Sequence, residues 1–244
     1  MASQIPQTID RDIFTRTITG SVSLSRFIHL LNDSPHIAKF VEELCFDAHA
    51  NYVDTTLKPW IHELATIPVS RLTRIRSLRF SKVRCICFEK NEALLRTLRT
   101  YATVQEVHFC ECSFPTFIDF EVFVAALPAV TRFSVDLITW SVADKLHIDR
   151  MIADPPKLQL SIVEFLWFAD PVKFCSWLLR MPIPPTLRSV AFQRVMLADA
   201  QLVGIFLTKL GPGLRNLRIG CRFDKDPAMT KCTCDPFPPA MFIS

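Results

Sequence analysis

The stretch Leu214-Arg215-Asn216-Leu217-Arg218-Ile219 decides the fold, because its apolar residues stand at the first, fourth and sixth positions. Six earlier segments keep this spacing with other apolar residues. They are Val41/Leu44/Phe46, Ile75/Leu78/Phe80, Val104/Val107/Phe109, Val130/Phe133/Val135, Leu160/Val163/Phe165 and Leu187/Val190/Phe192. The first positions of successive copies lie 26 to 34 residues apart in a chain of 244 residues. Seven copies in order indicate that one structural unit repeats along the chain.

The repeat has the length and the spacing of a leucine-rich repeat. The mean step of about 29 residues lies at the top of the range for that class. In such a unit the fourth and sixth residues of a short strand point inward, and the first lies where the chain bends into the strand. We therefore expect inward residues such as Val190 and Leu217 to matter most for stability, and Leu217→Asp to unfold the C-terminal repeats.

Helical periodicity separates the copies. Apolar residues recur at helical spacing in segments 91–101, 116–127, 171–180 and 199–210. Gly211 follows the last segment as a typical C-cap, and Pro212 cannot continue that helix. Nearer the N-terminus we expect a helix from Leu24, and a second helix with Ser34 as its cap and Pro35 in its first turn. These patterns predict an α/β fold: a leucine-rich-repeat solenoid of about seven irregular repeats, with a curved parallel sheet and outer helices.

Composition divides the chain into three parts. Residues 1–21 are polar and rich in threonine, and we expect a strand or an irregular lead-in segment there. Residues 22–220 form the repeat domain. Residues 221–244 are rich in Pro and Cys and have neither helical nor strand periodicity. We expect them to form an irregular, disordered tail.

Charge and cysteine content exclude several classes of protein. The net charge of +4 comes from interspersed basic and acidic residues, whereas a dedicated nucleic-acid binder concentrates Lys and Arg on one face. Most of the nine cysteines stand in apolar repeat segments, where they behave as small hydrophobes. The N-terminus has no secretory pattern, and no apolar run approaches the roughly 18 residues of a membrane span. We expect an intracellular protein, cytoplasmic or nuclear, with neither a nucleic-acid nor a membrane partner.

The segment from Phe27 to Leu44 carries a resemblance to a known family. It resembles the junction between the F-box and the degenerate leucine-rich repeats in F-box proteins of mushroom-forming (basidiomycete) fungi. Later segments resemble the same family, and the likeness covers roughly residues 22–220. These segments are Trp60 ahead of Ile67-Pro68, Phe114-Pro115-Thr116-Phe117, Leu127-Pro128-Ala129-Val130, Trp177-Leu178-Leu179-Arg180 and Leu207-Thr208-Lys209-Leu210-Gly211-Pro212.

The resemblance implies a protein-interaction module that recognises substrates for a Skp–cullin–F-box ubiquitin ligase. Other subunits would transfer ubiquitin, so this chain would not itself be an enzyme. The implied partners are a target protein on the concave face and, if an F-box-like element exists, a Skp-type adaptor and a cullin. The residues before the first helix contain no Leu-Pro pair, and we expect the F-box itself to be missing.

The missing F-box leaves other interpretations open. One is a free-standing leucine-rich-repeat binding protein without a role in ubiquitin transfer. Another is a truncated, non-functional member of the family. A third is an unrecognised hydrolase, which the absence of any catalytic motif disfavours.

The third and fifth residues of each strand are predicted to line the concave face, where repeat proteins commonly bind partners. Charged residues and one histidine at these positions are our candidate partner-binding residues. They are Glu43, Arg79, Glu106, His108, Arg132, Glu164 and Arg218. The alternative interpretation is an ordinary solvated sheet surface, because large aromatic anchors are missing from these positions.

The sequence nominates no catalytic, cofactor-binding or metal-binding residue. It contains three Cys-x-Cys pairs, Cys85/Cys87, Cys110/Cys112 and Cys232/Cys234, but a zinc site usually needs a second pair at a defined distance. We interpret the first two pairs as buried repeat residues, and we leave open metal or redox chemistry at the third, with Cys221 nearby. No Gly-x-Ser-x-Gly, His-Glu-x-x-His or phosphate-binding glycine loop appears.

Overall fold

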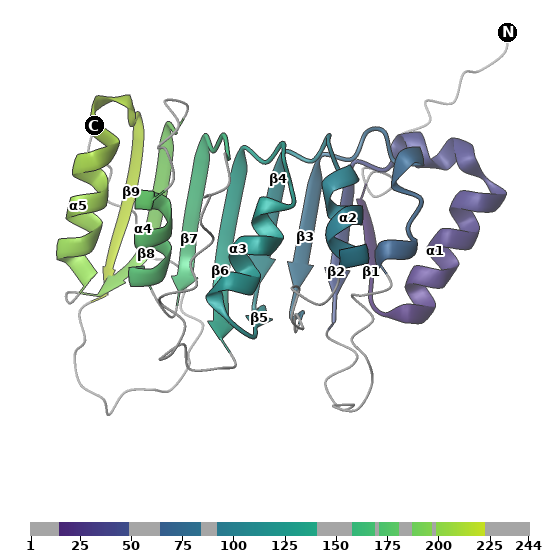
Figure 1. Cartoon of the computed structure of the whole chain (residues 1–244), viewed down its shortest axis with the longest axis horizontal. Helices are drawn as coiled ribbons and strands as arrows, with labels where there is room; N and C mark the ends of the chain where they lie inside the picture. The colour runs from purple at the N-terminus through teal and green to yellow at the C-terminus, as the bar shows by residue number, and fades with distance from the viewer. Residues whose placement is uncertain are drawn as a thin grey trace, which may run out of the picture.

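A computed structural model describes residues 15–48, 64–83, 92–140, 158–168, 171–180, 187–196 and 199–222. In this part of the chain a parallel sheet runs in the order β1-β2-β3-β4-β6-β7-β8-β9, and the short β5 pairs with β6 (Figure 1). The strands are β1 (Thr15–Ile18), β2 (Glu43–Asp47), β3 (Ser77–Ser81), β4 (Glu106–Cys110), β5 (Ser113–Phe114), β6 (Arg132–Trp140), β7 (Ile162–Phe168), β8 (Ser189–Met196) and β9 (Asn216–Arg222).

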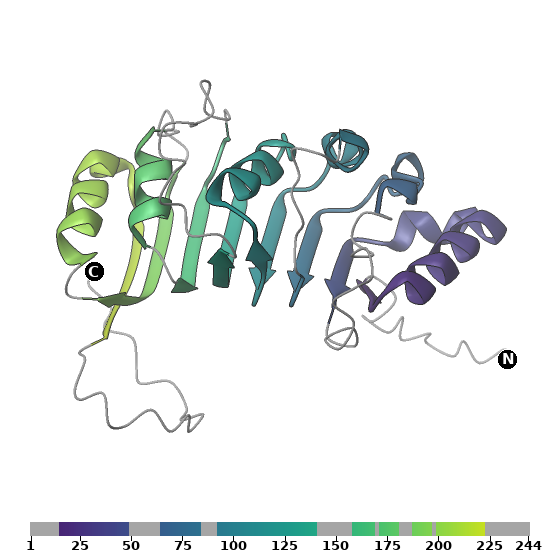
Figure 2. The ribbon, with the colours of Figure 1, turned by 60° about the horizontal axis from the view of Figure 1, so that its bottom comes forward.

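Helices lie on one face of this sheet, between successive strands in the sequence. They are α1 (Ser21–Asp33), η2 (Pro35–Phe40), η5 (Val69–Arg71), α2 (Glu92–Thr100), α3 (Phe117–Ala125), α4 (Pro171–Arg180), α5 (Ala200–Leu210) and η8 (Gly211–Gly213). Figure 2 shows the strands following an arc with the helices along its outer side. The α/β class with a parallel sheet, predicted from the sequence, is confirmed.

The apolar positions of the sequence copies meet in register across the sheet. The fourth positions align from Leu44 through Leu78, Val107, Phe133, Val163 and Val190 to Leu217. The sixth positions align in the same way from Phe46 to Ile219. Because alternate residues of a strand point to opposite faces, both rows face the helices. The spacing found in the sequence is therefore the hydrogen-bonding register of the sheet.

Aromatic rings fill the space between sheet and helices. Phe80 stacks between Phe46 and Phe109, with ring centroids 5.2 and 5.4 Å apart, and Phe165 stacks on Phe192 at 5.3 Å. Val135 interrupts this row, and rings from α3, α4 and β6 connect Phe109 on one side of it to Phe165 on the other. These rings are Phe120, Phe133, Phe174 and Trp177. Burial of such rings is a main source of the stability of the fold.

The helix boundaries follow the sequence patterns closely, although α1 begins at Ser21 rather than at the expected Leu24. The segments predicted as 91–101, 116–127, 171–180 and 199–210 contain α2, α3, α4 and α5. The N–H of Gly211, at a φ of 63°, donates to Leu207, as expected of a C-cap. The helix after Pro35 has Ser34 at its N-cap position and Pro35 in its first turn, as expected, but it is 3₁₀ and the Ser34 side chain forms no capping hydrogen bond.

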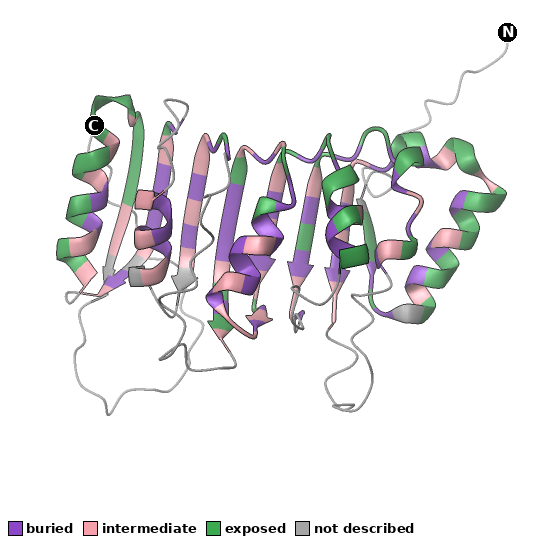
Figure 3. Cartoon of the chain, in the orientation of Figure 1, coloured by how far each residue is buried: buried purple, intermediate pink, exposed green. Residues whose placement is uncertain are grey.

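Leu217 is not buried as we expected. Its side chain is 37% exposed, whereas Val190, its neighbour in β8, is 1% exposed. The reason is that, among the described residues, β9 is the last strand of the sheet and no further unit covers it. Figure 3 shows β9 largely exposed beside the buried bands that cross β3, β4 and β6. Leu217 therefore lies in the inward row as expected but is much less buried than Val190.

The ends of the expected repeat domain are only partly described. Strand β1 lies inside the expected lead-in segment 1–21 and pairs in parallel with β2. Strand β9 extends two residues beyond 220, to Arg222. The remainder of the lead-in before Thr15 and the expected tail after Arg222 lie outside the described residues. None of the described helices is both long and apolar enough to cross a membrane.

Candidate partner-binding surface

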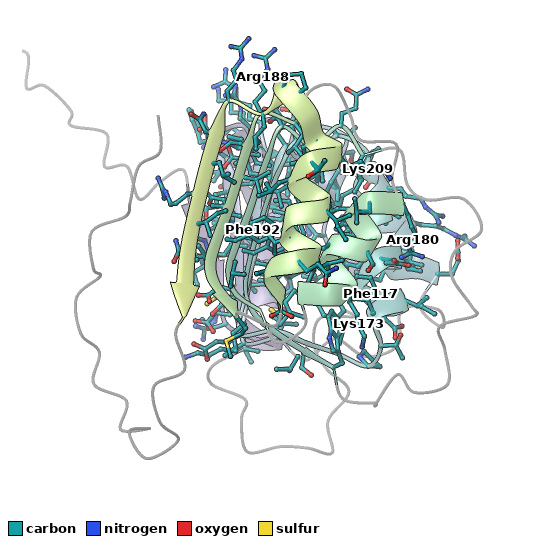
Figure 4. The ribbon with its side chains drawn as sticks, turned by 90° about the vertical axis from the view of Figure 1, so that its left-hand side faces the viewer. Phe117, Lys173, Arg180, Arg188, Phe192 and Lys209 are labelled. Atoms are coloured by element: carbon teal, nitrogen blue, oxygen red, sulfur yellow. The ribbon has the colours of Figure 1, made fainter. Side chains whose placement is uncertain are left out.

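The face of the sheet opposite the helices carries polar side chains in two rows. We define the open face as the residues at the third and fifth positions of the seven sequence copies. The third residues align as Glu43, Ser77, Glu106, Arg132, Ile162, Ser189 and Asn216, and the fifth as Cys45, Arg79, His108, Ser134, Glu164, Ala191 and Arg218. These rows alternate with the buried rows because the side-chain period of a strand is two residues. In Figure 4, which views the sheet from its β9 end, the helices lie on one side only, and Phe192 lies between sheet and helices.

Five of the seven candidate residues lie together on β2, β3, β4 and β6. Arg79 Nε donates to Glu43 Oε1 over 3.2 Å, from β3 to β2. Arg132 Nη1 donates to Glu106 Oε1 over 2.8 Å, from β6 to β4, and His108 Nε2 lies 3.7 Å from the other Glu106 oxygen. We call Glu43, Arg79, Glu106, His108 and Arg132 the charged cluster. The register of the sheet brings its members together from positions 26 to 36 residues apart.

His108 is the titratable group at the centre of the charged cluster. Partial burial lowers its pKa below the ordinary value of 6.5, and the nearby Arg79 guanidinium lowers it further. The carboxylates of Glu106 and Glu43 oppose this shift without cancelling it. His108 is therefore mainly neutral at pH 7, and its contact with Glu106 acquires ion-pair character only in more acidic solution.

Glu164 and Arg218 lie apart from the charged cluster. They share a row with His108, but Ala191 separates Glu164 on β7 from Arg218 on β9. Neither side chain forms an ion pair with any described residue. The structure thus divides the candidates into five residues that form two neighbouring ion-paired groups and two residues without an ion pair to a described residue.

The ion pairs of the charged cluster contribute little to folding. The side chains of Arg79 and Arg132 are about half exposed, at 49% and 50%. Exposed ion pairs of this kind are worth roughly 0 to 1 kcal/mol. A pattern of charges on an accessible face can instead select a partner by electrostatic complementarity. The cluster is therefore better suited to recognition than to stabilisation.

Cys45, Cys110, Cys112 and Cys175 are protonated thiols. Burial raises the pKa of Cys45 on the open face, and burial together with Asp136 raises that of Cys110. For Cys112 and Cys175 burial raises the pKa to about 12. The Cys112 thiol donates to the carbonyl oxygens of Phe80 and Cys110. A thiol of this kind is a poor nucleophile, because the reactive species is the thiolate.

Metal ligands do not converge in the described part of the chain. The described residues contain no group of three or more His, Cys, Asp or Glu side chains that could hold a metal ion. Cys112 is buried as expected, while Cys110 is only partly buried. Cys85/Cys87 and Cys232/Cys234 lie outside the described residues. Metal or redox chemistry at Cys232/Cys234 therefore stays a hypothesis from the sequence.

Two arginines that we did not select lie beside the candidate surface. Arg188 and Arg215 occupy the second repeat position, just before β8 and β9, and both are exposed. Arg215 and Asn216 donate their backbone N–H groups to the Arg188 carbonyl over 2.8 and 2.9 Å, which places the two arginines on adjacent strands. Arg188 projects beyond the ends of the strands (Figure 4). The alignment of the copies, which already placed both at one position, could have found this pair.

A comparison of the chain with protein-family models finds no match, and a comparison with curated proteins finds none either.

Proposed function

We propose that this chain is a leucine-rich-repeat protein-interaction module that holds a target protein on its open face. The observation that carries the proposal is the register: the third and fifth residues of the seven sequence copies, most of them polar, form two continuous rows opposite the helices. A curved array of this kind offers an extended surface to one partner. The partly exposed charged cluster gives that surface a definite charge pattern.

The target chemistry follows from the arrangement of charges. Arg79 and Arg132 lie on β3 and β6 and flank His108 on β4, while Glu43 and Glu106 neutralise them in the free chain. A partner that presents carboxylates to these arginines and amines to the glutamates would exchange the internal pairs for intermolecular ones. Such an exchange gives specificity more than affinity. The partner surface is therefore of mixed charge.

The resemblance to fungal F-box proteins supports a more specific role for this module. In this role the repeats hold a substrate for a Skp–cullin–F-box ubiquitin ligase, and other subunits transfer ubiquitin. The chain itself then has no catalytic residue. The support for this role is the likeness of residues 22–220, together with a fold that leaves one face of the sheet free of described helices.

Affinity capture of the tagged full chain from its native cells, followed by mass spectrometry, tests the ligase role. A Skp-type adaptor and a cullin at near-stoichiometric levels, together with a further protein, are expected. Recovery of a reproducible partner without adaptor or cullin would instead identify a binding module outside ubiquitin transfer. Recovery of chaperones alone would contradict both roles.

A further inference from the structure

The two ends of the sheet differ in how deeply their apolar side chains are buried. At the β1 end, Ile18 is buried, and Leu24, Phe27 and Leu31 of α1 are buried with it. At the β9 end, Leu217 is 37% exposed. Leu214 and Ile219 are likewise only partly buried, whereas their counterparts before and in β8 are buried. The apolar layer therefore continues to the β9 end without a described unit that closes it.

The outer edge of β9 also offers backbone hydrogen-bonding groups. Strand β9 is seven residues long and pairs with β8 on one side. Among the described residues no strand pairs with its other side. An exposed edge of this length can accept an extended peptide as an additional strand. Main-chain hydrogen bonds would supply affinity, and alternate side chains would supply specificity.

Positive charge surrounds this edge. Arg215 precedes β9, Arg218 lies within it, and Arg188 lies beside Arg215 on the neighbouring strand. None of the three forms an ion pair with a described residue. Arg218 lies on the open face, and Leu217 and Ile219 lie on the helix face, because successive side chains alternate. A strand added here meets cations on one face and apolar side chains on the other.

We propose that the outer edge of β9 binds an extended acidic peptide in which acidic residues alternate with apolar ones. An acidic residue between two apolar residues lies opposite Arg218, and the flanking apolar residues cover Leu217 and Ile219. This match holds for either direction of the peptide, because Arg218 stands between the two apolar residues. In a peptide that runs parallel to β9, a second acidic residue three positions before the first also reaches Arg215. This surface lies apart from the charged cluster on β2, β3, β4 and β6 and includes only Arg218 of the candidate target-binding residues, so the proposal does not depend on target binding by that cluster.

Fluorescence anisotropy with the full chain tests this proposal. The probe is a labelled peptide Ser-Glu-Thr-Val-Glu-Val-Thr-Ser. One comparison peptide carries Lys in place of both Glu residues. Another carries N-methyl groups on alternate amides, which remove the hydrogen-bond donors along one edge of the peptide. Binding of the acidic probe is expected, with affinity at least about tenfold weaker for each comparison peptide.

Charge reversal on the chain provides the matched control. Arg215→Glu combined with Arg218→Glu is expected to weaken probe binding at least about tenfold. Arg74→Glu combined with Arg76→Glu is expected to leave it unchanged. Arg74 and Arg76 are exposed arginines without an ion pair to a described residue, and they precede β3, far along the sheet from β9. Arg79→Glu combined with Arg132→Glu, within the charged cluster, is also expected to leave probe binding unchanged.

Two results would overturn the proposal. One is equal binding of the acidic and lysine peptides, or binding that the Arg215/Arg218 reversal does not weaken. The other is occupation of the edge by the protein itself. Sedimentation that shows a dimer dissociated by the Arg215/Arg218 reversal would assign the edge to a second copy. Failure to bind any probe at about millimolar peptide, where even the weakest specific binding would register, would show that the edge is already covered.

Discussion

Gly220 of β9 lies so close to Gln193 of β8 that a Cβ on Gly220 would stand 2.3 Å from the Gln193 carbonyl oxygen. The register of the two strands shifts between Phe192 and Val195, and the extra length of β8 directs this carbonyl toward Gly220. Backbone atoms cannot move aside as a flexible side chain can. A residue without a side chain is therefore required at this point for the two strands to pair.

We predict that Gly220→Ala destabilises the chain by about 1 to 3 kcal/mol, through a backbone shift at the β8–β9 pairing. The matched control is Gly204→Ala on α5, where an added Cβ meets no atom within 4 Å. That change is expected to stabilise the chain by about 0.5 to 1 kcal/mol, because alanine favours a helix interior. Denaturant unfolding monitored by circular dichroism measures both. Equal effects of the two changes would contradict this close contact.

The unequal burial of Val190 and Leu217 predicts unequal effects of the same substitution. Val190→Asp places a carboxylate in the core and is expected to cost more than about 3 kcal/mol. Leu217→Asp places one at a partly exposed edge and is expected to cost about 1 kcal/mol. Thermal unfolding of both variants measures the difference. If Leu217→Asp proves as damaging as Val190→Asp, the C-terminal end of the sheet is more deeply buried than described.

Leu137 adopts a left-handed backbone conformation, with a φ of 53°, although it is neither glycine nor asparagine. Lys82 and Glu111 adopt the same conformation after β3 and β4, so the turn recurs along the sheet. The strain in an L-residue there is about 1 to 2 kcal/mol, and glycine avoids it. Because Leu137 is 39% exposed, Leu137→Gly is expected to be about 1 kcal/mol more stable than Leu137→Ala. The two free energies of unfolding test this, and an alanine variant of equal or greater stability would rule out the strain.

Arg180 of α4 donates to Glu121 of α3, and the Glu121 side chain is almost fully buried. Burial raises the pKa of Glu121 above its ordinary value, and Arg180 opposes the shift. A raised pKa in the folded state means that the chain loses stability as pH rises through that pKa, because ionisation of Glu121 is disfavoured in the fold. Without Arg180 this loss becomes larger.

We therefore predict that Arg180→Met lowers the free energy of unfolding by about 2 kcal/mol at pH 7, somewhat less than the loss for a fully buried pair. At pH 4 the same substitution is expected to lower it by clearly less than at pH 7. Glu121 is largely protonated at pH 4 and then leaves no buried charge unpaired. The control is Arg96→Met, which removes an exposed partner of Glu92 on α2 and is expected to change little at either pH. Denaturant unfolding at the two pH values measures the effect. A loss for Arg180→Met that is independent of pH would contradict a buried glutamate charge.

The sequence was sufficient to predict the register of the sheet, because the same three apolar positions recur in every copy. Leu44 and Leu78, 34 residues apart, must face the same interior, and this requirement alone aligns their strands. Pairing of β1 was harder to predict, since Thr15-Arg16-Thr17-Ile18 offers a single apolar residue. The exposure of Leu217 could not be predicted from its own repeat, because burial there depends on what lies beyond β9.

The sequence was sufficient to predict which residues lie in the rows of the candidate surface, but not which of their side chains contact one another. Alternation placed Glu106 and Arg132 on the open face, but only the structure shows that they pair with each other, whereas Glu164 and Arg218 form no ion pair with a described residue. Rotamers of long side chains are set by neighbours on adjacent strands, which the pattern of one copy does not contain. Arg188 and Arg215 were overlooked because we considered only the strand positions and not the bend that precedes them.

Charge reversal within the charged cluster shows whether the open face binds the target. Binding of the captured target to the full chain is measured by titration calorimetry for the wild type and two variants. Arg79→Glu with Arg132→Glu reverses the open face, while Arg96→Glu with Arg99→Glu reverses exposed arginines on α2, which also lie in ion pairs. We expect at least about tenfold weaker binding for the first variant and unchanged binding for the second. Unchanged binding for both, or loss only with the α2 variant, would contradict it.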